Sequence, residues 1–328
     1  MKIFTETEKL KTLYNDRYSN GGIAYMDEWK SDEKDRIKEI IKNIKFSKKG
    51  RALDFGCGNG VFVKVLAEAL PEWIIVGCDA SEVAIQNAKQ RYPQYTFFVS
   101  ASGEMDVSFI NSFDLVFSHH VLEHVGNIVK TAEEINEYLK PRADMIHVLP
   151  CGNKGSLEWN ICQLHKNGID KNCGNRFFYE DIGHLRRLTT DDMDRLFCIH
   201  GFHKKYEYYN NIYWGAIFWI TNNGRSIIQK LTDTNNAISA SAGVKLSCYK
   251  FIFLILYYLQ IPYKWYRAVK VKKDKCFYHK FFLIADFLPQ LCTGYIPRFI
   301  RKKADKEWNN DNNKKNGSSM YLHYVRNI

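Results

Sequence analysis

Residues 52–60 read ALDFGCGNG, and this segment constrains the fold more than any other part of the 328-residue chain. Positions 51–55 are mostly apolar and predict a strand, and positions 61–70 have the spacing of an amphipathic helix. The three glycines between them permit backbone angles that other residues avoid and allow a ligand to approach closely. The turn also presents backbone N–H groups at the start of a helix, where negative charge is favoured. A strand–turn–helix unit that binds a ligand through its backbone is therefore predicted.

A second apolar stretch, 73–78, predicts the next strand and ends in Asp79, about twenty positions after the glycines. An acidic residue at the tip of that strand is placed to accept hydrogen bonds from the two hydroxyls of a ribose. Together, the glycine turn and Asp79 predict a site for a nucleoside cofactor.

The glycine spacing resembles one family in particular. The dinucleotide pattern G-x-G-x-x-G fails at its third glycine, where this chain has Val61, and the additional glycine is Gly60. The segment instead resembles motif I of the class I methyltransferases that use S-adenosylmethionine, and residues 77–81, GCDAS, resemble the ribose-binding loop of that family. The resemblance implies that Asp54 helps to hold the ammonium of the methionine moiety.

Later segments follow in the order typical of this family. Strands are predicted over 95–99, 113–118 and 144–149, with a helix over 127–140, and residues 119–125, HHVLEHV, resemble the ubiquinone-type and sugar-modifying O-methyltransferases. The resemblance covers residues 10–222. It implies a Rossmann-like α/β fold, a seven-stranded and mostly parallel sheet with an antiparallel last strand and helices on both faces. The closing strands are expected at 206–213 and 216–221.

The resemblance also assigns a set of cofactor contacts. The family usually has an acidic residue after strand three, near the adenine, whereas this chain reads SASGE over 100–104, so Ser102 or a backbone group is expected there. In relatives, a segment before the sheet closes over the cofactor, which suggests Tyr14 and Arg17, with simple surface packing as the alternative. The expected contacts are Asp54, Gly56, Cys57, Gly58, Asn59, Gly60, Asp79, Ala80, Ser102, Ser118, Tyr14 and Arg17.

Histidines gather after the fourth predicted strand. If a helix begins near His120, then His120, Glu123 and His124 share one face and could bind a divalent metal. A similar E-x-x-E-H metal motif occurs in the small-RNA terminal 2′-O-methyltransferases, with Glu where this chain has His120. That resemblance implies His184 as a fourth ligand. Two alternatives remain open: Glu123 and His124 brace the helix, or they act directly as acid and base.

Transfer to a hydroxyl would also need a base, and histidine titrates near neutral pH. His119, directly after the fourth strand, is the first candidate and His184 the second. His147 lies within a predicted strand and is expected to be a core histidine, and His165 is left unassigned.

Charge and composition divide the chain. Residues 225–328 contain 19 Lys/Arg and 6 Asp/Glu, a balance of +13, so the chain's total of +11 leaves −2 for residues 1–224. This distribution argues against a basic nucleic-acid groove around the cofactor. The expected division is cofactor-covering helices at 1–45, a methyltransferase domain at 46–224 with a substrate lid at about 150–188, a basic and apolar helical tail at 225–305, and a disordered end at 306–328.

The tail contains two apolar runs, 251–259 and 277–291, neither of which reaches the roughly 18–20 residues that span a bilayer. Their Trp, Tyr, Lys and Arg flanks predict helices that lie on an anionic membrane surface, and packing or dimer contact is the alternative. The nine cysteines form no C-x-x-C pair, and the first ten residues do not resemble a signal peptide. A cytoplasmic protein is expected, and surface-bound tail helices would make it peripheral on the inner membrane face.

The predicted function is S-adenosylmethionine-dependent O-methylation of a saccharide or lipid-linked glycan at the membrane surface. Methylation of a quinone or another lipid is the first alternative, and a non-catalytic nucleoside-binding scaffold is the second. The signature of N6-adenine methyltransferases is absent after the fourth strand, so chemistry on a nucleobase is not expected.

Overall fold

The computed structural model describes residues 6–20, 31–100, 106–172, 174–181, 183–271 and 294–326. The chain forms two compact units, each assembled from separate segments. The first comprises residues 1–150, 182–207 and 320–328, and the second comprises residues 151–181 and 208–319. The expected continuous domain at 46–224 is therefore divided between the two units, and the chain returns to the first unit at its C-terminal end.

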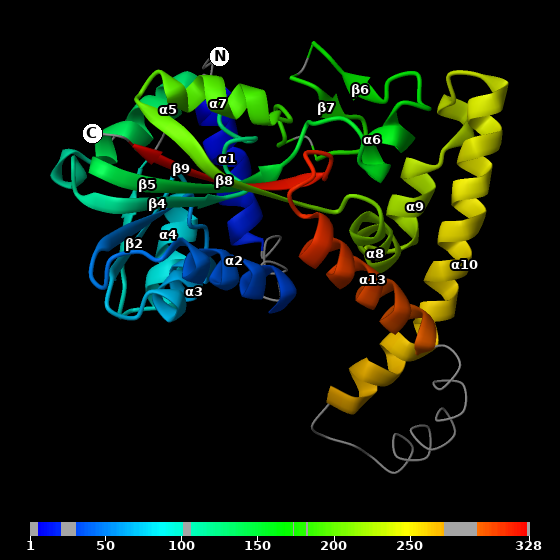
Figure 1. Ribbon diagram of the computed structural model, residues 1–328, viewed down its shortest axis with the longest axis horizontal. Helices are drawn as coiled ribbons and strands as arrows, with labels where there is room; N and C mark the ends of the chain where they lie inside the picture. Colours follow the sequence, from blue (N-terminus) through cyan, green and yellow to red (C-terminus); the bar gives the residue numbers. More distant parts are fainter. Residues whose placement is uncertain are drawn as a thin grey trace. The chain divides into compact units, whose positions relative to one another are not determined.

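A seven-stranded sheet with the order β3-β2-β1-β4-β5-β9-β8 organises the first unit (Figure 1). β1 pairs in parallel with β2 and β4, and β2–β3 and β4–β5 are also parallel. The sheet is mostly parallel with an antiparallel last strand, which confirms the predicted fold class. The strands are β1 (Arg51–Phe55), β2 (Ile74–Asp79), β3 (Thr96–Val99), β4 (Phe113–His119), β5 (Leu139–Pro150), β8 (Phe202–Asn210) and β9 (Ser319–Arg326).

Helices cover both faces of this sheet, α3 on one and α5 with α7 on the other (Figure 1). Their starts follow from capping chemistry: the side chains of Ser81, Asn127 and Thr189 accept hydrogen bonds from the first turns of α4, α5 and α7. Each cap satisfies a backbone N–H that the helix leaves unpaired. The helices are α1 (Glu6–Ser19), α2 (Ser31–Ile44), α3 (Val61–Ala69), α4 (Glu82–Arg91), α5 (Ile128–Tyr138) and α7 (Thr190–Cys198).

Two predictions about the closing elements were wrong. The strand predicted at 216–221 is part of a helix, α8 (Trp214–Asn222). Its sequence is apolar on every side, so periodicity could not separate a buried strand from a buried helix. The end predicted to be disordered, 306–328, continues a helix to Asp311 and then forms β9, which lies between β5 and β8. Residues 308–319 are rich in Asn and Lys, but the apolar side chains of β9 complete the sheet.

The second unit is mostly helical and has its own core. Buried side chains from the predicted lid segment pack with α8, α9 and α10, among them Ile161, Phe177, Ile220, Leu246 and Phe253. Residues 151–181 are thus part of a helical subdomain. Its elements are α6 (Leu157–Cys162), β6 (Ile169–Asp170), β7 (Arg176–Phe177), α8, α9 (Arg225–Leu231), α10 (Ala240–Val271) and α13 (Tyr295–Asp311).

The apolar run at 251–259 belongs to a much longer helix than the sequence suggested. Within α10, the 23 residues Ala240–Pro262 have a mean hydropathy of 1.4 and are long and apolar enough, by length and composition, to cross a membrane. The expectation that neither run reaches this length was therefore wrong for the first run. Small residues before position 251 extend the helix, and Pro262 lies within it. The second run, 277–291, lies outside the described residues.

Candidate active site

The glycine turn after β1 adopts backbone angles that favour glycine. Gly56, Gly58 and Gly60 have φ values of 75°, 52° and 78°. A Cβ on Gly56 would lie 2.3 Å from a methyl carbon of Val121, and a Cβ on Gly58 would lie 2.5 Å from the hydroxyl of Tyr18. Backbone conformation therefore favours glycine at all three positions, and lack of space beside Val121 also excludes a side chain at Gly56.

Asp79 fastens this turn to the end of β2. One carboxylate oxygen of Asp79 accepts a 2.9 Å hydrogen bond from the Gly58 N–H, and the other accepts a 2.8 Å bond from the Ser81 N–H. Burial raises the pKa of this carboxyl even though these donors favour its charged form. Asp79 thus stands at the tip of β2 beside the glycine turn, as the sequence predicted.

Asp54 lies on β1 directly beneath the turn and is 1% exposed. One of its carboxylate oxygens has no hydrogen-bond partner among the described residues. Burial, and then the charge of Asp79, raise the pKa of Asp54 well above its ordinary value. An unpaired buried carboxylate oxygen is costly, and a bound ammonium would satisfy it. The glycine turn, Asp79 and Asp54 therefore fit a nucleoside cofactor that carries a cationic amino acid moiety.

Helix α1 lies over the same loops. Ser81 donates a 2.6 Å hydrogen bond to the Asn15 side chain, and the Tyr18 hydroxyl abuts Gly58. Sequence reasoning did not select Asn15 or Tyr18, because a helix that covers a site carries no motif. The two residues that the sequence predicted, Tyr14 and Arg17, contact each other. The Tyr14 ring packs edge-on against His124, with ring centroids 5.6 Å apart, and the guanidinium of Arg17 lies over the Tyr14 ring. Cofactor contact by Tyr14 and Arg17 stays a prediction.

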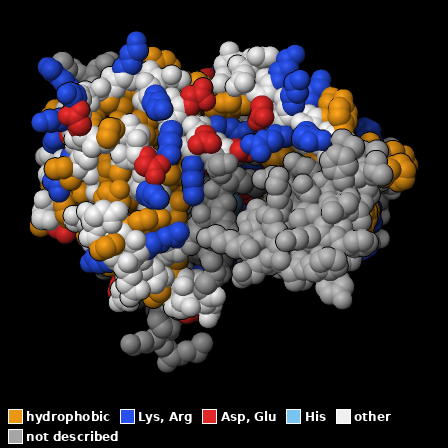
Figure 2. Space-filling model, turned by 90° about the horizontal axis from the view of Figure 1, so that it is seen from below, with side chains coloured by type: hydrophobic (Ala, Val, Ile, Leu, Met, Phe, Trp, Pro, Cys, Tyr) orange, Lys and Arg blue, Asp and Glu red, His pale blue; other side chains and the backbone are white. Residues whose placement is uncertain are grey.

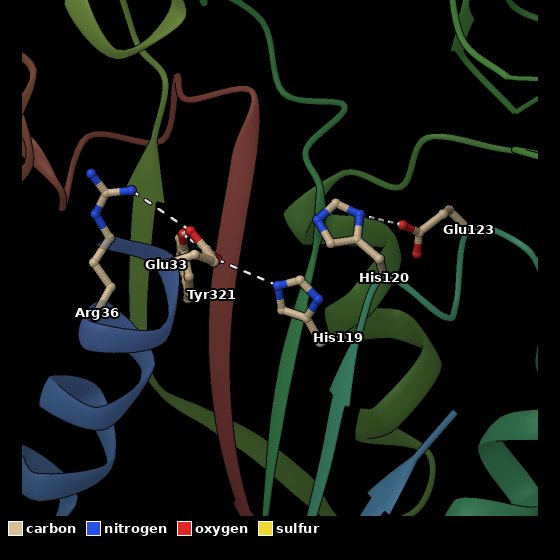
Figure 3. Close-up of polar contacts among 6 residues, drawn as sticks. All are labelled: Glu33, Arg36, His119, His120, Glu123 and Tyr321. Carbon is tan, nitrogen blue, oxygen red and sulfur yellow. Dashed lines mark hydrogen bonds and ion pairs between the residues drawn. The ribbon is translucent and has the colours of Figure 1, made fainter. Parts of the chain in front are cut away.

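The segment after β4 is a turn rather than a helix, so the expected helical face at His120 was wrong. His120 has a positive φ of 54°, and the following helix, α5, begins only at Ile128 behind its Asn127 cap. The turn nevertheless brings His120 and Glu123 together. The Nδ1 atom of His120 donates to a Glu123 carboxylate oxygen at 2.8 Å, as Figure 3 shows.

Residues 183–187 are fastened to this turn by hydrogen bonds. His124 donates from Nδ1 to the Gly183 carbonyl at 2.8 Å, and the Leu185 N–H donates to the Glu123 carbonyl at 2.9 Å. The Arg186 guanidinium donates to carbonyls of the turn, among them that of Gly126 at 2.9 Å. Because of these bonds the rings of His124 and His184 lie 4.6 Å apart between centroids. The sequence prediction that His184 joins this turn agrees with this geometry.

Three of the four suggested metal ligands converge. One ligand atom each from Glu123, His124 and His184 lies within 4.8 Å of the others. The fourth suggested ligand, His120, is not part of this group, and instead hydrogen-bonds to Glu123. Since His124 donates from Nδ1, its Nε2 keeps a lone pair, as metal-binding imidazoles require.

The electrostatics of the cluster favour a charged carboxylate. Glu123 is fully buried, and its second carboxylate oxygen has no hydrogen-bond partner among the described residues. Burial alone would raise the pKa of Glu123, but the neighbouring imidazoles, His120 first, lower it to about 2. Burial also lowers the pKa of His124, which keeps this imidazole neutral. A buried anion beside imidazoles suits a bound cation or the transfer of a proton from a substrate.

His119 points away from this cluster towards α2 and β9 (Figure 3). Its Nε2 atom lies 3.5 Å from Glu33, and its ring stacks on Phe62 with centroids 4.1 Å apart. Burial lowers the pKa of His119 to about 4, although Glu33 raises it. Glu33 in turn accepts a 2.8 Å hydrogen bond from the hydroxyl of Tyr321 in β9. The imidazole is buried and neutral at physiological pH.

The remaining candidates have structural partners. The Ser118 hydroxyl and His147 Nδ1 are 2.7 Å apart, and His147 is fully buried, which confirms its assignment as a core histidine. The Nε2 atom of His165 donates to the Leu231 carbonyl at 2.8 Å within the second unit. Ser102 lies outside the described residues.

Comparisons with known proteins identify a family for the chain. Residues 46–213, just over half of the chain, match the family model described as "Methyltransferase domain". A malonyl-[acyl-carrier protein] O-methyltransferase of Legionella pneumophila is 32% identical over 106 residues, which are 32% of this chain and 37% of that protein. An uncharacterized methyltransferase of Schizosaccharomyces pombe is 27% identical over 184 residues, 52% of this chain and 65% of that protein.

Among solved structures, a TehB-like SAM-dependent methyltransferase from Corynebacterium glutamicum is 15% identical with a TM-score of 0.39, and the match covers 60% of this chain and 86% of that chain. The family match therefore rests on the sequence model. The chain belongs to the methyltransferase domain family.

Proposed function

We propose that this protein transfers the methyl group of S-adenosylmethionine to a hydroxyl oxygen of a saccharide or a lipid-linked glycan. Family membership supports the cofactor-dependent methyl transfer. The observation that carries the cofactor assignment is the oxygen of buried Asp54 that lacks a hydrogen-bond partner among the described residues, because this oxygen suits the cationic amino group of the cofactor. Asp79 is placed to accept hydrogen bonds from the ribose hydroxyls.

The hydroxyl acceptor is supported by the cluster of Glu123, His124 and His184. This cluster adjoins the glycine turn, since Val121 packs against Gly56 and the Tyr14 ring packs against His124. In the reaction, the acceptor oxygen attacks the methyl carbon, the carbon–sulfur bond breaks, and S-adenosylhomocysteine leaves. The hydroxyl proton must go to a base. We assign this role to His184, which is partly exposed, and a positioning role to the buried His119.

Glu123, His124 and His184 also fit a divalent cation, with one carboxylate and two imidazoles as its ligands. A bound cation would lower the pKa of an acceptor hydroxyl. The protein residues hold the acceptor near the glycine turn and keep Glu123 charged. Positioning provides much of the rate in such a displacement.

The test is transfer of an isotope-labelled methyl group from S-adenosylmethionine to three acceptor sets: nucleotide sugars, undecaprenyl-linked glycans and hydroxylated quinones. Labelled product from either glycan set supports the proposal, and product from quinones alone supports the lipid alternative. Cofactor binding in calorimetry without transfer to any acceptor would favour a nucleoside-binding scaffold. The variant His184→Gln should abolish transfer to the true acceptor, whereas His203→Gln, at an exposed histidine, should leave it unchanged.

A further inference from the structure

One face of α10 exposes apolar side chains over much of its length, and this stripe is here called the outer face. At 3.6 residues per turn, its members fall within an arc of about 180° around the helix. Their exposed fractions range from 37% for Leu259 to 68% for Phe251. Its members are Val244, Phe251, Ile252, Ile255, Tyr258, Leu259 and Ile261. Figure 2 shows hydrophobic side chains at the surface near Lys and Arg side chains at the right-hand edge of the view, where α10 lies.

The opposite face of α10 packs into the core of the second unit. Leu246, Phe253 and Gln260 are each no more than 1% exposed, and Leu246 and Phe253 belong to the unit's core. The Lys264 ammonium donates a 3.0 Å hydrogen bond to the Thr221 carbonyl at the end of α8. A membrane-spanning position would surround α10 with lipid and break these contacts. The packing instead favours a helix that keeps one face on the protein and offers the other to a partner.

Charge indicates which partner suits the outer face. Residues 225–328 have a balance of +13. The exposed side of α13 carries one anion, Asp305. It also carries four cations, which are Arg298, Arg301, Lys302 and Lys306. Since α13 packs against α10, a second copy docked on the outer face would bring a second basic unit close to this one, and the two would repel. An anionic bilayer suits both features, because its acyl region can bury the apolar stripe and its negative headgroups attract the basic residues.

We propose that the outer face of α10 binds an anionic lipid bilayer, with the helix lying along the boundary between headgroups and acyl chains. Ala240–Pro262 extends about 35 Å at 1.5 Å per residue, so the stripe forms a long line of contact. Apolar burial supplies most of the attraction, and the basic residues add a part that salt weakens. Its biological purpose rests on the proposed function, because a lipid-linked acceptor would be reached at the membrane.

The experiment is co-sedimentation of the full-length chain with vesicles of phosphatidylcholine, or of phosphatidylcholine and phosphatidylglycerol at 3:1. The test variant combines Phe251→Ser, Ile255→Ser and Leu259→Ser on the outer face. Its matched control combines Val107→Ser and Ile199→Ser, exposed apolar positions of the first unit. The parent and the control should bind the anionic vesicles, and the test variant should bind at least about tenfold more weakly. Binding of the parent should fall severalfold between 50 mM and 500 mM salt, and alkaline carbonate should release it.

Equal vesicle binding by the parent and the test variant would overturn the proposal, as would an absence of parent binding. If light scattering shows that the parent is a dimer and the test variant a monomer, the outer face is a contact between copies instead. Calorimetry with S-adenosylmethionine is run on the same samples. A loss of vesicle binding with intact cofactor binding separates failure of this inference from failure of the proposed function.

Discussion

The Nε2 atom of His119 lies 3.5 Å from the Glu33 carboxylate, which also accepts the hydroxyl of Tyr321. These three residues come from β4, α2 and β9, so the contact joins elements from the middle and both ends of the chain. Glu33 also lies 3.6 Å from the Arg36 guanidinium, and its pKa is lowered: burial would raise it, but His119 and then Arg36 outweigh that effect. The network fixes the His119 ring beside the active-site turn.

The first prediction concerns this pair. Glu33→Gln should destabilise the fold by roughly 1–3 kcal/mol, because it leaves buried polar groups without their charged partner. The affinity for S-adenosylmethionine should change less than about twofold, since Glu33 is assigned no cofactor contact. Urea unfolding and calorimetry measure the two quantities. Glu39→Gln, on the same helix, is the control, because Glu39 is assigned no part in this network. Unchanged stability in Glu33→Gln would show that the network contributes nothing to the fold.

The second prediction tests the cofactor site through Asp54. Asp54→Asn keeps the size of the side chain but removes its charge, so the cofactor ammonium should lose roughly 1.5–3 kcal/mol of binding energy. Calorimetry should show an affinity about ten- to 150-fold weaker. Asp191→Asn, in the exposed first turn of α7, is the matched control. Equal affinity in the two variants would remove Asp54 from the site.

The third prediction addresses the metal. Calorimetric titration of the protein with Mn²⁺ or Zn²⁺ alone should show one site, and Glu123→Gln should weaken it at least about tenfold, because the buried anion is lost. His203→Gln should bind the metal as the parent does. No saturable binding by the parent at millimolar metal would leave Glu123, His124 and His184 as a metal-free acid–base cluster, and activity should then survive chelation.

Features that depend on neighbouring residues could be predicted from the sequence, whereas features that depend on contacts between distant residues could not. The glycine turn and Asp79 were predictable because their backbone geometry and spacing follow directly from local chemistry. The contact between His184 and His124 was suggested only by resemblance, since it depends on hydrogen bonds from Arg186 and Leu185 to a turn about 60 residues away. Local patterns could not reveal that β9 returns from the C-terminal end of the chain to the sheet.

The same limit applies to α8. Its sequence gives no cap at its start, and a residue far along the chain supplies one instead. The Glu307 carboxylate of α13 accepts hydrogen bonds from four successive backbone N–H groups, those of Ile212, Tyr213, Trp214 and Gly215, at 2.8–3.1 Å. A capping residue about 90 positions away cannot be found by reading local sequence.

The fourth prediction concerns pH. Burial lowers the pKa of His119 to about 4 and that of His147 to about 3, from an ordinary value of 6.5. Between pH 6.5 and pH 4, these two histidines are protonated in the unfolded chain but not in the native state. The free energy of unfolding should therefore fall as the pH drops from 6.5 towards 4. His120 contributes in the opposite sense, because its pKa is raised. Urea unfolding at pH 7 and pH 5 measures the difference, which should be smaller in His147→Gln. An equal loss in that variant would show that His147 does not contribute.

The last prediction concerns the cap that Glu307 provides. Glu307 is 8% exposed, and its carboxylate lies at the positive end of α8, where it is favoured by the helix dipole as well as by its four donors. Glu307→Gln retains one acceptor oxygen but loses the charge, so the second unit should be destabilised by roughly 1–2 kcal/mol. Asp305→Asn, two residues earlier on the exposed side of α13, is the control and should cost less than about 0.5 kcal/mol. Hydrogen exchange of the Trp214 and Gly215 amides should accelerate in Glu307→Gln alone. Amide protection that is the same in both variants would mean that the four hydrogen bonds do not hold the start of α8.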